Sequence, residues 1–294
     1  MFGIEDSIMG KIQEMLLGLI QTNLEAMFLD INDKVTEMAT EVGKTPQGWN
    51  SEVFNFIKSI NDTVIIPIAG LILTAVLCIE LIQLVTEKNN MHSDADTFEF
   101  FKYVIKMWIA VWLASHAFTF SMAVFDVGQH LVTQAAGVIN ISSKLDSSDI
   151  VAMVSSLEES SPGGKHLASL LAIAVETSLV KISVQIVAII VFVITYGRMI
   201  EICIYSSVAA IPFATMGNKE WGQIGNNYIK GLFALGLQGL FLMICLGVYS
   251  VLIKTVQVGS DIHESLFGVL GYTVLLAIMM TKSGSLSKSL MNAH

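Results

Sequence analysis

The sequence contains few charged residues and only one arginine. Asp, Glu, Lys and Arg make up 14% of its 294 residues, whereas an ordinary soluble domain has about 25%. Hydrophobic residues make up 53%. A long chain with this composition is typical of a protein that crosses a membrane several times. The net charge of −9 leaves no basic surface of the kind that binds nucleic acid.

Cysteines and catalytic motifs are also scarce. Cys78, Cys203 and Cys245 lie far apart in separate apolar runs, which excludes a C-x-x-C zinc pattern or a disulfide framework and predicts small buried side chains. The chain has no Walker-type phosphate loop, no H-E-x-x-H and no G-x-S-x-G. Its first residues lack the basic start and compact apolar core of a signal peptide. We therefore expect no catalytic residue, no cofactor, no metal site and no enzymatic activity.

The N-terminal region, residues 1–62, has a helical period. Apolar residues recur at three- and four-residue steps over residues 4–38, and acidic and polar residues fill the opposite face. This pattern is too polar to cross a bilayer. It predicts an amphipathic helix that lies at the membrane interface, packs on partner helices or belongs to a soluble hairpin, and the acidic face favours partners. Lys44–Trp49 is expected to break this helix, and Asn50 or Ser51 to cap the next one.

Five apolar segments have the length and composition of membrane spans. They are Val64–Val85, Val104–Phe125, Leu179–Tyr196, Lys230–Ile253 and Leu266–Met280. A serine-rich polar segment separates the second span from the third, and one short amphipathic helix is expected in it around residues 150–157. The chain then divides into two spans (63–125), an extracytoplasmic loop (126–166), a C-terminal span cluster (167–281) and a cytoplasmic tail (282–294).

The segment Met199–Met216 decides the topology. If it crosses the membrane, the basic residues of the short loops divide four against four between the two sides. If it does not cross, only Lys254 lies opposite the other seven, as the positive-inside rule prefers. Those seven are Lys88, Lys102, Arg198, Lys219, Lys230, Lys282 and Lys288. We therefore predict an all-α polytopic membrane protein with about five spans, in which Met199–Met216 is re-entrant or packed within the bundle.

Arg198 is the most informative residue of the chain. It is the only arginine, it follows a long apolar run, and Glu201 lies one helical turn beyond it. One interpretation is structural, in which Arg198 and Glu201 pair and anchor the re-entrant segment that ends near Pro212. The other is that they form a gate or a subunit contact along a water-filled path, because intramembrane charges often line such paths.

Three further polar residues lie inside predicted spans. Glu80, in the last third of the first span, is expected to snorkel or to face the bundle interior. His116 lies in the second span and is interpreted as a satisfied interior histidine or a proton relay. Gln238 lies in a glycine-rich span, where glycines permit close helix contact, and is expected to form an interhelical hydrogen bond.

The layout resembles the TrbL family, the polytopic subunit of type IV secretion machines that corresponds to the sixth VirB protein. It resembles especially the relatives in conjugative elements of low-GC Gram-positive bacteria. The resemblance covers most of the chain: an N-terminal helical region, a pair of spans, a polar central loop and a C-terminal span cluster. Locally it involves Arg198-Met-Ile-Glu201 followed by Ala209-Ala-Ile-Pro212.

This resemblance implies a non-enzymatic channel or scaffold subunit in the bacterial inner membrane. Its expected partners are membrane lipid, the other channel subunits and ATPases of the machine, and DNA in transit without sequence-specific binding. Self-association is expected as well, because the N-terminal apolar stripe would otherwise stay bare. The alternatives are an independent small-molecule or ion transporter, which would require inverted repeats or paired intramembrane charges, and an accessory membrane protein of a mobile element.

Overall fold

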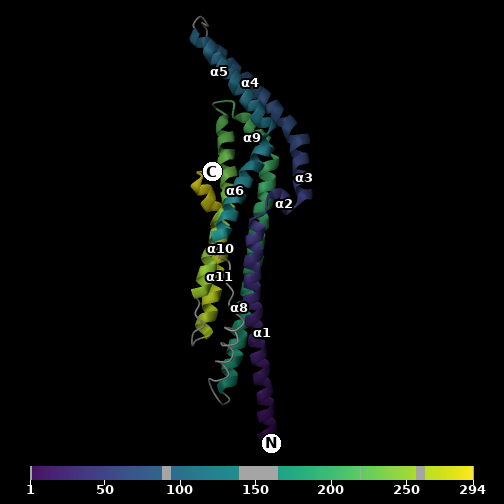
Figure 1. Cartoon of the computed structure of the whole chain (residues 1–294), viewed down its shortest axis with the longest axis vertical. Helices are drawn as coiled ribbons and strands as arrows, with labels where there is room; N and C mark the ends of the chain where they lie inside the picture. The colour runs from purple at the N-terminus through teal and green to yellow at the C-terminus, as the bar shows by residue number, and fades with distance from the viewer. Residues whose placement is uncertain (1, 88–93, 139–164, 219, 256–261, 294) are drawn as a thin grey trace. The chain divides into compact units, whose positions relative to one another are not determined.

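The structure, a computed structural model, describes residues 2–87, 94–138, 165–218, 220–255 and 262–293. All regular elements in these residues are helices, which confirms the predicted all-α class (Figure 1). The first elements are α1 (Phe2–Val42), α2 (Pro46–Trp49), α3 (Ser51–Ile60), the π-helical turn η1 (Asn61–Ile65), α4 (Ile66–Glu87), α5 (Asp94–Ser115) and α6 (Ala117–Val138). They are followed by α8 (Lys165–Ser207), α9 (Ala210–Thr215), α10 (Gly222–Thr255) and α11 (Ile262–Leu290).

Each predicted span lies within a helical stretch that is long and apolar enough to cross a membrane. Among the described residues there are four such stretches, or five if a bent pair of helices counts as one span. The four are Ser51–Thr86, Leu167–Ser207, Gly222–Ile253 and His263–Leu290, and the bent pair is Phe100–Ser115 with Ala117–Val138. The chain is therefore a polytopic α-helical membrane protein.

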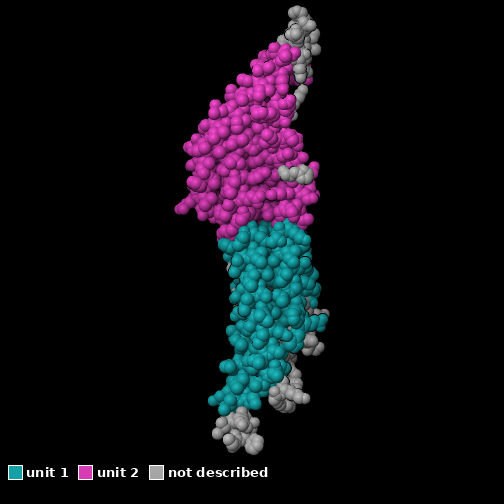
Figure 2. Space-filling view, turned by 180° about the vertical axis from the view of Figure 1, so that it is seen from behind, with its two compact units in different colours: residues 1–41, 135–195, 242–282 teal, residues 42–134, 196–241, 283–294 magenta. Residues whose placement is uncertain are grey.

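The chain forms two compact units, which Figure 2 shows in different colours. Unit 1 comprises residues 1–41, 135–195 and 242–282, and unit 2 comprises residues 42–134, 196–241 and 283–294. Helices α6, α8, α10 and α11 contribute residues to both, and α1 ends with Val42 in unit 2.

In unit 1 the amphipathic helix α1 packs on α8. Asn23 donates from Nδ2 to the Ser178 hydroxyl at 2.9 Å, and Lys181 donates to Asn23 Oδ1 at 3.4 Å. The centre of the apolar stripe is buried in the folded chain, with Leu16, Ile20, Leu24 and Met27 at most 6% exposed. The folded chain thus covers the centre of the stripe, whereas Ile8, Met15 and Leu19 of the same stripe remain exposed.

Two polar contacts join the other helices of unit 1. The Oε2 atom of Glu176 on α8 lies 2.5 Å from the Nδ1 atom of His263 on α11. The hydroxyls of Tyr249 on α10 and Thr273 on α11 are 3.1 Å apart and buried. A buried polar group needs such a partner, since an unpaired one costs free energy. These pairs therefore fix which faces of α8, α10 and α11 meet.

The predicted second span, Val104–Phe125, is not a straight helix. It is broken at His116, where α5 and α6 meet at 70°. The Ser115 hydroxyl donates to the Val111 carbonyl at 2.8 Å, and His116 Nδ1 lies 2.9 Å from the Trp112 carbonyl. Side chains that bind carbonyls one turn back compete with the helical ladder and bend the helix, so two consecutive polar residues account for a bend without proline or glycine.

The segment Met199–Met216 divides into two parts. Its first part continues α8 to Ser207, so the helix does not stop at the predicted span end, Tyr196. Its second part forms α9, which packs against α4 and α5 (Figure 1). Ala209, Ala210, Phe213 and Ala214 are fully buried there. The packed apolar segment that the charge distribution predicts is therefore α9.

Two predicted boundaries differ from the helices. Helix α6 extends to Val138 and so includes the first part of the predicted loop 126–166. Helix α11 extends to Leu290 and includes most of the predicted tail 282–294. The short helix predicted around residues 150–157 lies outside the described residues, as do Lys88 and Lys219 of the charge count.

Candidate functional site

Helix α9 is held in unit 2 by a cluster of aromatic rings. Phe213 on α9 contacts Phe120 edge-on at a centroid distance of 5.4 Å and Tyr228 at 5.6 Å. Tyr228 in turn stacks on Tyr205 at 4.8 Å with the ring planes 7° apart. Its hydroxyl donates to the Tyr205 carbonyl at 2.7 Å. The rings supply buried apolar area, and this hydrogen bond satisfies the Tyr228 hydroxyl.

Tyr205 also explains a glycine of α10. A Cβ atom built on Gly231 would lie 2.5 Å from the Tyr205 hydroxyl oxygen. Any side chain at this position would displace the ring from its stack on Tyr228. The glycine therefore belongs to the aromatic cluster, which we define as Phe120, Tyr205, Phe213 and Tyr228.

A charged network lies at the other end of α9. Glu80 on α4 accepts from Lys106 on α5 at 3.1 Å and from Asn218 Nδ2 at 3.0 Å, through different carboxylate oxygens. Asn218 Oδ1 accepts from the backbone N–H groups of Glu220 and Trp221 at 2.8 and 3.2 Å, just before α10 begins. The Glu80 side chain is 12% exposed, so it faces the bundle interior, one of the two placements expected. One asparagine thus connects the α4–α5 pair to the start of α10.

Helices α6 and α10 cross at two glycines. A Cβ on Gly128 would lie 2.8 Å from the Gly236 carbonyl oxygen and 3.1 and 3.2 Å from its C and Cα atoms. Seen from the other side, a Cβ on Gly236 would lie 3.6 Å from the Val124 carbonyl oxygen. The glycine-rich span therefore allows backbone contact, as expected of small residues in helix pairs within membranes.

Arg198 lies in the interior of unit 2 and is not paired with Glu201. Its side chain is 6% exposed, and its Nε and Nη1 atoms have no hydrogen-bond partner among the described residues. The guanidinium lies against Gly239 on α10, where a Cβ would come within 2.6 Å of Nη2 and 3.0 Å of a Val132 methyl group. Glu201, one turn along α8, instead lies 3.5 Å from the Lys288 ammonium of α11.

Gln238 forms the interhelical hydrogen bond expected of it. Its Nε2 donates to the hydroxyl of Ser283 on α11 at 3.4 Å, and both side chains are buried. One turn further along α11, the buried Ser287 hydroxyl donates to the Ala234 carbonyl of α10. A Cβ on Gly284 would lie 3.2 Å from Gln238 Nε2, so the end of α11 approaches α10 closely.

The two remaining candidates have local roles. His116 is exposed and stacks on Trp112 at 4.9 Å, so it is part of the α5–α6 bend rather than an interior contact. Pro212 occupies the first turn of α9, where a missing N–H group leaves no hydrogen bond unmade. Its carbonyl accepts from the Thr215 hydroxyl at 2.7 Å.

Sequence reasoning did not identify Asn218, Tyr228 or the Gly128–Gly236 crossing. Asn218 has a recognisable signal, since an asparagine side chain in a turn commonly accepts from backbone N–H groups two or three residues further along the chain. The other contacts join residues far apart in the chain. No group of three His, Cys, Asp or Glu side chains among the described residues is arranged to hold a metal ion. Chemically, the described residues of this region offer buried hydrogen bonds, the Glu80–Lys106 and Glu201–Lys288 ion pairs and the buried Arg198 guanidinium.

A family model described as TrbL/VirB6 plasmid conjugal transfer like protein matches residues 31–210, more than half of the chain. The match begins within α1 and includes α2 to α6 and all of α8. Glu80, His116, Arg198 and Glu201 therefore lie inside the matched range. No curated protein and no solved structure matches the chain.

Proposed function

Since the chain belongs to the TrbL/VirB6 family of plasmid conjugal transfer proteins, we propose that it forms the oligomeric base through which a conjugative type IV secretion machine passes DNA and protein. Its family makes it a membrane subunit of conjugal transfer, and its apolar helices make it a multi-pass membrane protein. We place it in the bacterial inner membrane and in the low-GC Gram-positive branch, which its single arginine against 15 lysines supports.

The family match is the observation that carries this proposal, and the organisation of unit 2 supports a channel or scaffold role. Several polar groups in unit 2 bind one another across helices, as in the Glu80–Asn218 and Gln238–Ser283 pairs. Such pairs stabilise a bundle, as a channel or scaffold subunit requires. The energy for transfer would then come from partner ATPases.

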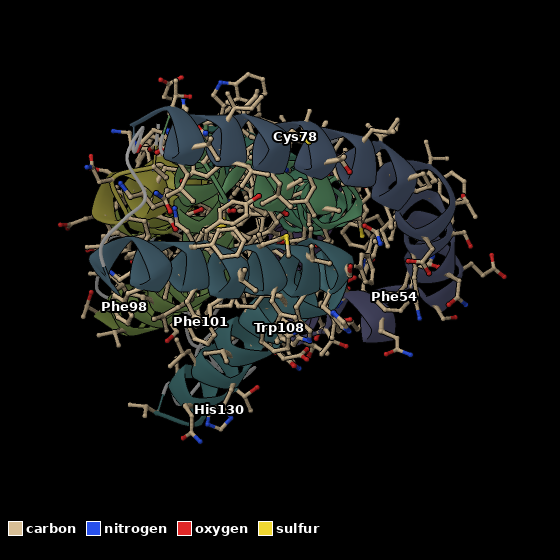
Figure 3. The ribbon with its side chains drawn as sticks, turned by 90° about the horizontal axis from the view of Figure 1, so that it is seen from above. Phe54, Cys78, Phe98, Phe101, Trp108 and His130 are labelled. Atoms are coloured by element: carbon tan, nitrogen blue, oxygen red, sulfur yellow. The ribbon has the colours of Figure 1, made fainter. Side chains whose placement is uncertain are left out.

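Helices α4 and α5 supply a surface for lipid and for neighbouring subunits. In the Ser51–Thr86 stretch only 17% of the most apolar window is buried, against 61% in Gly222–Ile253. Phe98, Phe101 and Trp108 are at least 60% exposed and lie along one side of α5 (Figure 3). Uncovered apolar helices are stable only against lipid or protein. We therefore propose that α4 and α5 face lipid and neighbouring copies.

Cross-linking through native cysteines tests the oligomer. Cys78 on α4 is exposed, whereas Cys203 on α8 is buried (Figure 3 labels Cys78). A membrane-permeable thiol cross-linker added to mating cells should give dimers and larger species that disappear in Cys78→Ser and persist in Cys203→Ser. A monomer alone, in both the cross-linked sample and a native gel, would contradict the oligomeric base.

A mating assay tests the function itself. Deletion of the coding sequence from its conjugative element should abolish DNA transfer, and the wild-type chain supplied in trans should restore it. The tagged chain should also co-purify with a secretion ATPase. If transfer is unchanged by the deletion and the purified protein moves a solute or ion into liposomes, the transporter alternative is correct. Unchanged transfer without transport activity would favour an accessory protein.

A further inference from the structure

Arg198 differs from four other charged residues of unit 2, which lie in ion pairs. Glu80, Lys106, Glu201 and Lys288 each have an oppositely charged neighbour within 3.5 Å. Arg198 has no oppositely charged neighbour among the described residues, although only 6% of its surface is exposed. Its Nε and Nη1 atoms lack any acceptor among the described residues.

A buried guanidinium without a counter-charge is energetically unfavourable. Taking an ion out of water costs several kcal/mol even after the protein relaxes, unless an opposite charge and hydrogen bonds replace the lost hydration. Arginine stays protonated rather than escape this cost by losing its proton. Glu201 is one turn away but is engaged by Lys288. An anion from outside the chain is therefore the natural partner of Arg198.

The guanidinium occupies the place that a side chain at residue 239 would fill, since a Cβ on Gly239 would lie 2.6 Å from Nη2 and 2.9 Å from Cζ. On α8, Gly197 is exposed and has nothing within 4 Å of the place where its Cβ would be. The surface of α8 at Gly197, the residue before Arg198, is thus not covered by the described residues.

The level of Arg198 on α8 indicates which anion is available. Glu201 and Lys288 are 43% and 52% exposed, and a half-exposed ion pair in a membrane helix marks the zone of the lipid headgroups. Glu201 is three positions after Arg198, which corresponds to a rise of about 4.5 Å along the helix axis. The oxyanion concentrated at this depth is the phosphate of phospholipids.

We propose that Arg198, through its unpartnered Nε and Nη1 donors, binds a phosphate group, which is supplied by the headgroup of an anionic phospholipid. Arginine suits this ligand because its planar donors match the oxygens of a phosphate. Basic sites between membrane helices bind anionic headgroups in this way. The bound lipid is a structural component of unit 2 and fixes α8 against α6 and α10.

Lipid retention by the purified full-length protein tests the proposal. The protein is placed in neutral detergent with equal amounts of phosphatidylglycerol and phosphatidylcholine, and bound lipid is measured by native mass spectrometry. The wild type should retain one phosphatidylglycerol, and Arg198→Gln should retain it about tenfold less or weaker still, since a hydrogen bond to a charged group is worth about 1.5–3 kcal/mol. Lys58→Gln removes one exposed cation of α3 that has no part in the Arg198 site, and this variant should retain the lipid as the wild type does.

A second measurement covers the case in which Arg198→Gln does not fold. Phosphatidylglycerol should raise the melting temperature of the wild type more than phosphatidylcholine does, and Arg198→Lys, which keeps the charge but loses donors, should show a smaller rise. Inorganic phosphate is tested alone. A rise with phosphate but not with phosphatidylglycerol would assign the same site to free phosphate.

Three results would overturn the proposal. One is equal retention of phosphatidylglycerol by the wild type and a folded Arg198→Gln. Another is a wild type that responds to neither phosphatidylglycerol nor inorganic phosphate. The third is retention of a single-stranded oligonucleotide in preference to the lipid, which would make the site a nucleic-acid contact. These readouts measure binding, so they stand apart from the mating assay of the proposed function.

Discussion

Replacing Gly128 with alanine tests the crossing of α6 and α10. The new Cβ would lie 2.8, 3.1 and 3.2 Å from the carbonyl oxygen, carbonyl carbon and Cα of Gly236. These are backbone atoms of a helix, so they cannot rotate away as the end of a side chain can. The two helices must therefore move apart, and contacts along the crossing are lost.

The expected loss follows from two opposing effects. Alanine in a helix is favoured over glycine by about 0.5–1 kcal/mol. Overpacking of a well-packed contact costs about 1–3 kcal/mol. The net destabilisation by Gly128→Ala is then on the order of 1–2 kcal/mol, or a few degrees in melting temperature for a protein of this size. DNA transfer should fall with the amount of folded protein.

Gly70 on α4 provides the matched control. It lies inside a helix, it is exposed, and nothing lies within 4 Å of its Cβ position. Gly70→Ala should therefore leave the melting temperature unchanged or raise it slightly. Intrinsic tryptophan fluorescence during heating in detergent measures both variants. A Gly128→Ala protein that melts at or above the temperature of Gly70→Ala would refute the crossing.

Three other substitutions probe single contacts. Asn218→Ala removes the hydrogen bond to Glu80 and the hydrogen bond to the backbone N–H of Glu220 before α10. The melting temperature should therefore fall by the equivalent of about 1–3 kcal/mol. No change in a heating scan would show that the network is not formed. Tyr228→Phe keeps the ring but loses the hydrogen bond to the Tyr205 carbonyl. Urea titration should show a free energy of unfolding that is lower by about 1 kcal/mol. A decrease as large as that caused by Tyr228→Ala would contradict separate contributions of the ring and the hydroxyl. Asn50→Ala removes the cap of α3. The free energy of unfolding should fall by about 0.5–2 kcal/mol, and the amide hydrogens at the start of α3 should exchange faster. Unchanged exchange would argue against the cap.

The membrane helices and some local signals could be read directly from the sequence. Each predicted apolar run lies in a helix, because a backbone in hydrocarbon must satisfy its hydrogen bonds within the segment. The helix break after Val42 and the cap by Asn50 were also predicted, since Pro46, Gly48 and an asparagine act on their immediate neighbours. Such signals need no knowledge of distant residues.

The interior contacts could not be predicted in the same way. Arg198 and Glu201 have the spacing of a helical ion pair, yet their partners depend on which helices surround α8. Arg198 points to Gly239, and Glu201 reaches Lys288, 87 residues further along the chain. The bend at His116 depends on side-chain rotamers that bind carbonyls one turn back, and residue types alone do not specify these rotamers.

The length of α8 has a consequence for the depth of the protein in the bilayer. Its 43 residues extend about 65 Å, roughly twice the 30 Å of a typical hydrocarbon core. A helix longer than the hydrocarbon core can fill cores of different thickness by changing its tilt. Hydrophobic mismatch then costs little when the bilayer becomes thicker or thinner. The protein should keep its stability in bilayers that differ by several ångströms in acyl-chain thickness.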